Sequence, residues 1–233
     1  MIIGRERNWK RVRKEKLSNN LFVIYLDEVL LKTDQGNHVS VSERLADKMV
    51  KEWSMEGKID TIKNSFFTKF CFAAIDITEN EREAVLGSLA DYSNCDPICY
   101  IADEPTKLHL KQKDLYKPLI DWTENFLLIK LNKASGLSFV EQPSLNSSKI
   151  KKYLEELDNF HLTAVHEITK SLGSLFTCLA LYNNKISSEL AWEIANVEDN
   201  FRIEVWGEVE EETQKKNTDS YHFKCLVNIL QLI

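Results

Sequence analysis

The segment from residue 160 to residue 182 has the clearest apolar periodicity in the sequence. Its apolar side chains recur at intervals of three and four residues, as on one face of a helix: Val165, Ile168, Leu172, Leu175, Phe176 and Leu179. Small residues flank this stripe, including Gly173, Ser174 and Cys178, and they allow neighbouring helices to approach closely. We therefore predict one long helix over residues 160–182 that packs among other helices.

The N-terminal part of the chain has a different period. Residues 9–12, 21–26 and 29–33 have the pattern of short strands, with turn-forming residues between them. From Ser42 the spacing of apolar residues becomes helical. Ser42 is the predicted N-cap of a helix that stops at Gly57.

The middle of the chain mixes helices with one further strand. Helices are predicted over residues 59–74 and 81–92, and Asn80 is the expected cap of the second. Residues 97–102 form a short apolar run bounded by prolines, which favours a buried strand. The next helix extends to about residue 126, and Pro118 should kink it or break it.

The C-terminal part is predicted to be helical throughout from residue 146, with Ser187 or Ser188 beginning one of its helices. The predicted fold class is therefore α+β. A small N-terminal α+β domain over residues 1–103 is followed by a larger all-helical C-terminal domain over residues 104–233.

Residues 197–212 predict an amphipathic helix with an unusual distribution of charge. An apolar residue recurs every four positions, at Val197, Phe201, Val205 and Val209. Glu204 and Glu208 project onto or beside that stripe, and Gly207 inside the helix costs roughly 1 kcal/mol relative to alanine. Two interpretations remain open, a core helix with an acidic rim and an apolar, acidic surface that docks a basic partner.

Composition excludes several classes of protein. A net charge of −6 argues against nucleic acid as the main partner, and no apolar run approaches the roughly 18 residues of a membrane-inserted span. The cysteines are scattered and predict reduced thiols without a metal site: Cys71, Cys95, Cys99, Cys178 and Cys225. Neither a signal peptide nor a transit peptide is evident, so we expect a bacterial cytoplasmic protein rather than one of the mitochondrial matrix.

The motifs of common enzymes are missing. The sequence has no glycine-rich phosphate loop, no dinucleotide fingerprint and no nucleophile elbow, so we expect neither catalysis nor a cofactor. The adjacent pair His166 and Glu167 is a weak candidate for acid–base work. A small hydrolase or transferase with its site in a cleft between the domains therefore remains the alternative, and a helical scaffold without a specific client is a third possibility.

Several short segments together resemble one protein family, the assembly chaperones that escort the α subunit of the F1 sector of ATP synthase. They occur in the family's order over nearly the whole chain: Trp9-Lys10, 31–33 with Gly36-Asn37, Glu52-Trp53, 98–100 with Glu104-Pro105, 118–122, Gln142-Pro143, 162–174, Ala191-Trp192, and Glu204 with 206–208.

The resemblance implies a fold, a partner and a set of binding residues. The family's fold has an N-terminal α+β domain and a C-terminal helical domain. Its members bind the unassembled α subunit and shield its β-facing surface, without catalysis, and we expect a monomer. The family's acidic residues in the last long helices match Glu204, Glu208, Glu210 and Glu211, and Trp206 lies among them. These five residues are the predicted partner-binding site.

Overall fold

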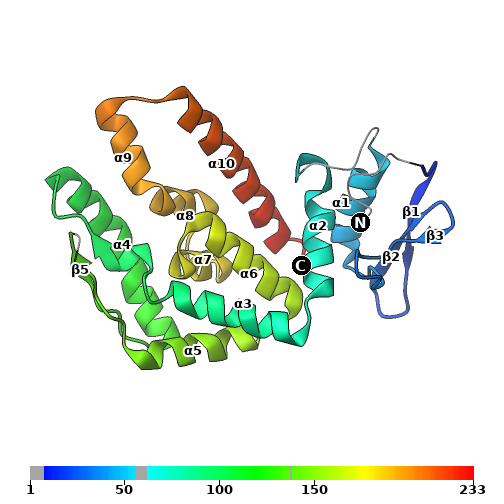
Figure 1. Ribbon diagram of the computed structural model, residues 1–233, viewed down its shortest axis with the longest axis horizontal. Coiled ribbons are helices and arrows are strands. Elements are labelled where there is room, and N and C mark those ends of the chain that lie inside the picture. Colours follow the sequence, from blue (N-terminus) through cyan, green and yellow to red (C-terminus); the bar gives the residue numbers. More distant parts are fainter. Residues whose placement is uncertain (1–7, 56–61, 137) are drawn as a thin grey trace. The chain divides into compact units, whose positions relative to one another are not determined.

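The computed structural model describes residues 8–55, 62–136 and 138–233, and the chain divides into two compact units (Figure 1). Unit 1 includes residues up to 81, together with 159–163 and 228–233; unit 2 includes residues 82–158 and 164–227. A small sheet region precedes many helices, which confirms the α+β class. The domain boundary at residue 103 remains a prediction. The two compact units divide the chain in another way, with residues 82–103 in unit 2.

Unit 1 begins with a three-stranded antiparallel sheet. Its strands are β1 (Val12–Lys16), β2 (Phe22–Leu26) and β3 (Val29–Leu30), in the order β1-β2-β3. The first strand starts three residues later than predicted, because the backbone amides of Lys10 and Arg11 instead donate to the Asp27 carboxylate.

Helix α1 (Glu43–Ser54) follows, and Ser42 is its N-cap as predicted, since the Ser42 hydroxyl accepts from the Leu45 amide. The predicted stop at Gly57 lies outside the described residues. Helix α2 (Ile62–Asp76) has one non-helical residue, Ser65, with φ −146°.

A buried carboxylate joins these two helices. Glu52 is only 7 % exposed, and its side chain accepts from the amides of Phe67 and Thr68 at 2.7 and 2.8 Å and from the Thr68 hydroxyl at 2.7 Å. Trp53 donates to the same hydroxyl at 3.0 Å, and Trp9 donates to the Trp53 carbonyl. Burial raises the pKa of Glu52 above its usual value despite these hydrogen bonds. The Glu52-Trp53 pair is therefore a structural junction of unit 1.

Replacing Glu52 with alanine is expected to lower the free energy of unfolding by about 3 kcal/mol, because three donors, two of them fully buried, would lose their acceptor. Urea unfolding followed by circular dichroism measures the change. Glu52→Gln keeps one oxygen and should lose less. A loss below about 1 kcal/mol in the alanine variant would contradict the structural role.

Unit 2 is built from helices with one short pair of strands. Parallel strands β4 (Tyr100–Ile101) and β5 (Ala134–Ser135) are hydrogen-bonded to each other. The helical elements are α3 (Glu79–Tyr92), the 3-10 turn η1 (Pro97–Cys99), α4 (Thr106–Leu127), α5 (Ser144–Glu155), α6 (Asn159–Leu172), α7 (Leu175–Tyr182), α8 (Ser188–Ala195), α9 (Val197–Trp206) and α10 (Glu210–Leu230). Helix α4 packs against α5, α7, α8 and α9, which places it at the centre of the unit.

The predicted helix over residues 160–182 is wrong in one respect, because it is two helices. Gly173 has φ +66°, which ends α6, and the Ser174 hydroxyl accepts from the Thr177 amide at 3.1 Å to begin α7. The apolar stripe itself is buried as predicted, with Val165, Ile168 and other members of the stripe inaccessible to solvent.

Asp96 is a fully buried carboxylate at the start of two helical elements. It accepts from the Ile98 amide of η1 at 3.3 Å, from the Phe176 amide of α7 at 3.0 Å and from the Ser174 hydroxyl at 2.8 Å. Burial raises the pKa of Asp96 to about 6, although these hydrogen bonds favour the charged form. The predicted strand at residues 97–102 is correspondingly shorter, because η1 occupies its first half.

Other boundaries differ in ways that local chemistry explains. Thr78 caps α3 instead of Asn80, since its hydroxyl accepts from the Glu81 amide while Glu81 accepts from the Thr78 amide. Of the kink or break predicted at Pro118, the break is absent, because helix α4 continues through this residue. Pro118 lies on the exposed face, where water can reach the carbonyl that proline leaves unpaired. Ser187 caps α8 as predicted.

The structure adds two observations on excluded classes. No helix among the described residues is long and apolar enough to cross a bilayer, and these residues form no cluster suited to a metal ion. All five cysteines are free thiols, and Cys71, Cys99 and Cys178 are buried.

Candidate functional site

The predicted partner-binding residues lie around the connection between α9 and α10 (Figure 1). The prediction of one helix over residues 197–212 is wrong, because α9 ends at Gly207 and α10 begins at Glu210. Gly207 has φ +85° and ψ 175°, a conformation that is essentially restricted to glycine. Its role is therefore to end α9, and it does not lie inside a helix.

Gly207→Ala is expected to lower the free energy of unfolding by about 2 kcal/mol, because an L-residue is strained in this conformation although the space around it is open. Gly87→Ala is a matched control. Gly87 lies inside α3 in equally open space, so alanine there should stabilise the protein by about 1 kcal/mol. Thermal unfolding of both variants measures the two effects. A stability change of the same sign in both variants would contradict the role of Gly207 as the residue that ends α9.

The connection presents exposed apolar side chains beside carboxylates. Val197 and Phe201 are buried as the stripe predicted, but Val205, Trp206 and Val209 are 52, 76 and 55 % exposed. We call this surface the α9–α10 tip: Val205, Trp206, Glu208, Val209, Glu210 and Glu211. Apolar side chains this exposed and this close together are typical of interaction sites.

Three carboxylates of the tip are available to a partner. The side chains of Glu208, Glu210 and Glu211 are exposed and form no hydrogen bond or ion pair with residues that the structure describes. Glu210 and Glu211 lie in the first turn of α10, where the helix dipole stabilises negative charge. The tip thus combines an exposed indole with uncompensated negative charge.

Glu204 is in a different position from the other predicted residues, because it already has a partner. The Lys111 ammonium on α4 lies 2.8 Å from its carboxylate, and this hydrogen bond holds the pKa of Glu204 below its usual value. Nearby, the buried Gln112 donates to Glu198 at 2.9 Å and accepts from the Ala102 amide at 2.7 Å. These contacts fix α9 on α4 and so position the tip.

A second set of contacts ties α9 to α10. The Arg202 guanidinium donates to Asp199 at 3.1 Å and to Glu212 at 2.8 Å, and Lys216 donates to Asn200 at 2.5 Å. Beside them is a polar hollow of about 300 Å³. Sequence reasoning missed Arg202, although its spacing of three from Asp199 is typical of helical ion pairs.

The candidate acid–base pair gains no catalytic support from its surroundings. His166 Nδ1 lies 3.3 Å from Glu167, closer than expected for adjacent helical residues, and Lys170 lies 3.2 Å from the same carboxylate. The pKa of Glu167 is lowered chiefly by the hydrogen bond from His166, which makes it a weaker base.

Comparison with known proteins identifies the family. The family model described as ATP12 chaperone protein matches residues 6–124, which is just over half of the chain. The chain belongs to this family. It is a family of F1-ATPase assembly chaperones, and such a role is not catalytic, so the expectation of a non-enzyme is confirmed.

Individual relatives agree with this assignment over nearly the whole chain. The mitochondrial protein Atp12 of Schizosaccharomyces pombe is 25 % identical over 226 residues, which cover 91 % of this chain and 77 % of that protein. The crystal structure of Atp12 from Paracoccus denitrificans is 27 % identical, with a TM-score of 0.87 and 97 % of each chain covered. A putative chaperone from Agrobacterium tumefaciens is 26 % identical with a TM-score of 0.87, covering 97 % of this chain and 85 % of that one.

The α9–α10 tip lies outside the residues that the family model matches, whereas the structural likeness to the Paracoccus protein covers 97 % of this chain. The relatives include both bacterial proteins and a mitochondrial one. Family and fold are thus assigned by comparison, whereas the role of each tip residue is argued from its geometry.

Proposed function

We propose that this chain binds the unassembled α subunit of the F1 sector and shields the surface that later contacts the β subunit. The observation that supports this most directly is the α9–α10 tip, where Trp206 is 76 % exposed beside three carboxylates without partners among the described residues. A subunit awaiting assembly exposes an apolar interface, and the tip offers an apolar contact of matching kind.

Charge gives the contact its selectivity. Glu208, Glu210 and Glu211 would face lysine or arginine side chains of the client, which speeds encounter and excludes acidic surfaces more than it adds affinity. Release needs only that the β subunit compete better for the same client surface. No nucleotide enters this mechanism, and we expect one copy of the chaperone per client, in the cytoplasm of a bacterial cell.

Glu204 has a secondary part in this proposal. A client cation can reach its carboxylate only by displacing Lys111, whose side chain is about half exposed. Exposed ion pairs contribute little to stability, so the exchange is feasible. The primary contacts are therefore Trp206 and the carboxylates of Glu208, Glu210 and Glu211.

A binding titration tests the proposal. Fluorescently labelled F1 α subunit, kept unassembled, is titrated with the full chain while anisotropy is followed, and labelled β subunit serves as the control. The expected result is saturable one-to-one binding to α that weakens as salt is added, with no binding to β. Failure to bind α, or equal affinity for both subunits, would overturn the proposal.

A further inference from the structure

Unit 2 has a second exposed apolar surface, far along α4 from the tip. On α5, Leu145, Lys149 and Lys152 are spaced by four and three residues and therefore share one face of the helix. All three are exposed, and the Leu145 side chain is 69 % exposed. The outer face of α5 is thus both apolar and basic.

The end of α4 contributes to the same surface. Leu128, in a left-handed conformation with φ +54°, ends the helix and is 74 % exposed. The Lys149 ammonium donates to the Leu128 carbonyl, and Asn146 donates to the Lys130 carbonyl at 2.7 Å. Leu128 and Lys130 are therefore held against α5, and we call the combined surface the α4–α5 corner: Leu128, Lys130, Leu145, Lys149 and Lys152.

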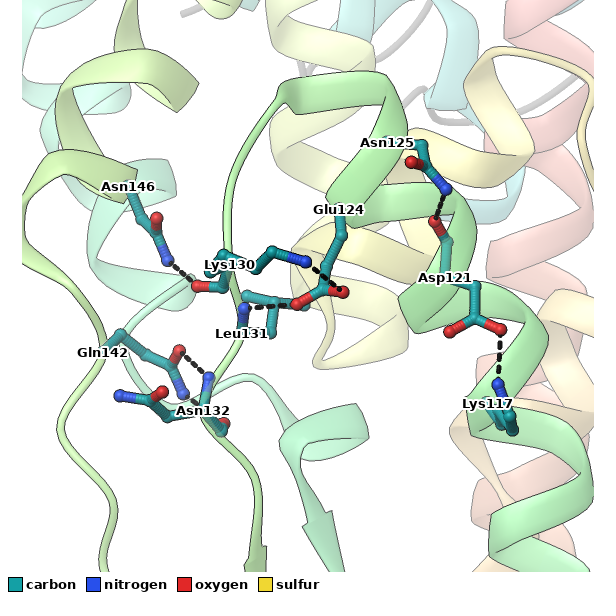
Figure 2. Close-up of polar contacts among 9 residues, drawn as sticks. All are labelled: Lys117, Asp121, Glu124, Asn125, Lys130, Leu131, Asn132, Gln142 and Asn146. Carbon is teal, nitrogen blue, oxygen red and sulfur yellow. Dashed lines mark hydrogen bonds and ion pairs between the residues drawn. The ribbon is translucent and has the colours of Figure 1, made fainter.

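A polar network fixes the backbone behind this corner (Figure 2). Glu124 accepts from the Leu131 amide at 2.8 Å, and its other oxygen lies 3.5 Å from the Lys130 ammonium. The Gln142 side chain accepts from the Asn132 amide at 3.0 Å and donates to the Asn132 carbonyl at 2.8 Å. The connection after α4 is thus preorganised, and a surface fixed in advance has less conformational entropy to lose on binding.

The corner is opposite in charge to the tip. The corner carries three lysines and no carboxylate, whereas the tip carries three glutamates and no cation. The Lys130 side chain is 83 % exposed. A surface of lysines around exposed leucines is complementary to a segment that carries carboxylates and apolar side chains together.

We propose that the α4–α5 corner is a second client-binding surface, which receives an acidic, apolar segment of the same client that the tip binds. The proposal rests on the proposed function. It goes further by stating the chemistry of a second client segment and by making the chaperone a two-site binder.

The geometry of α4 allows one client to reach both surfaces. Lys111, which contacts the tip helix, and Leu127, at the corner, are separated by roughly 24 Å along the helix axis. A folded client subunit is wide enough to span this distance along α4 and reach both surfaces. Two linked contacts on one client reinforce each other through effective concentration.

Zero-length cross-linking of the complex with a carbodiimide tests the proposal, because it joins a lysine only to a carboxylate that it touches. The full chain and the isolated F1 α subunit are cross-linked, and the products are identified by mass spectrometry. We expect links from Lys130, Lys149 or Lys152 to aspartate or glutamate residues of the client. Links from Glu208, Glu210 or Glu211 to client lysines, with none from the corner, would overturn the proposal that the corner binds the client. They would leave the proposed function intact. No link at either surface would count against both.

Paired variants supply an independent test. The corner variant Leu145→Ser with Lys152→Glu should bind the α subunit about ten-fold more weakly. The control variant Val29→Ser with Lys51→Glu makes analogous changes, from an exposed aliphatic residue to serine and from lysine to glutamate, in unit 1 and should bind as the wild type does. Equal affinities for the two variants would overturn the proposal.

Sedimentation with phosphatidylglycerol vesicles separates a protein client from an anionic membrane, which would also attract lysines beside exposed leucines. The expected result is no binding of the wild-type chain to these vesicles at physiological salt. Vesicle binding that the corner variant loses, with unchanged affinity for the α subunit, would assign the corner to the membrane and overturn the proposal.

Discussion

Replacing Asp96 with alanine is expected to lower the free energy of unfolding by about 4 kcal/mol. The carboxylate is fully buried and accepts from three groups, the Ser174 hydroxyl and the amides of Phe176 and Ile98. Alanine would leave these donors buried without an acceptor, and each unsatisfied group costs about 1–3 kcal/mol. It would also remove the acceptor that Asp96 provides at the start of α7. Urea unfolding of the full chain measures the loss.

Two variants show whether the effect belongs to this site. Asp121→Ala removes an aspartate whose ion pair with Lys117 is exposed, so it should leave stability nearly unchanged. Asp96→Asn keeps one acceptor oxygen and should lose less than alanine does. If Asp96→Ala were as stable as Asp121→Ala, the proposed role of Asp96 would be wrong.

The same carboxyl predicts a specific dependence on pH. Its pKa is about 6 in the folded protein, against an ordinary value of 3.8 in the unfolded chain, so between these values the folded state binds more protons. The stabilisation that comes from protonating Asp96 in the folded protein is therefore greatest below pH 3.8 and is lost as the pH rises through 6, while the hydrogen bonds to the carboxylate remain. Across this window the wild type should lose up to about 3 kcal/mol relative to Asp96→Asn. If the free energy of unfolding depended on pH in the same way in the wild type and in Asp96→Asn, the raised pKa of Asp96 would be contradicted.

Trp206→Ala is expected to weaken binding to the F1 α subunit about 30-fold, because truncating a central tryptophan of an interface typically costs about 2 kcal/mol or more. The same titration of labelled α subunit measures the affinity. Stability should hardly change, since the side chain is 76 % exposed. Val29→Ala, at an exposed position of unit 1, is the control and should bind normally.

The wild-type protein offers a second readout for the same prediction. Trp206 is the most exposed of the five tryptophans, so its burial by a client should shift the emission to shorter wavelength. The shift should be absent in Trp206→Ala. Unchanged affinity of this variant would remove Trp206 from the binding surface even if the α subunit still binds elsewhere.

Periodicity and cap residues predicted much of the fold. Ser42 and Ser187 begin helices as expected, since the hydrogen bond from a helical amide to a serine hydroxyl is a local interaction. The buried stripe of α6 and α7 was also identified correctly. The break between them was not, because Gly173 can occupy either a helix or a left-handed turn, and tertiary packing decides between the two. Gly207 was misassigned for the same reason.

The candidate site shows the other limit of sequence reasoning. The predicted tip residues include the exposed Trp206 and Glu208, but whether a carboxylate is free depends on residues far away in the sequence. Glu204 is paired with Lys111, 93 residues earlier, and no local pattern reveals that contact. The Ser174–Asp96 contact spans 78 residues and was missed for the same reason.

The most direct test of the proposed chaperone role is the fate of the unassembled α subunit itself. Unfolded F1 α subunit is diluted into buffer without nucleotide, with and without an equimolar amount of the chain, and light scattering is followed. We expect suppressed aggregation and a one-to-one complex by light-scattering mass, both lost in Glu208→Lys but kept in Glu28→Lys. Unchanged aggregation in the presence of the folded wild-type chain would contradict a role in escorting the α subunit.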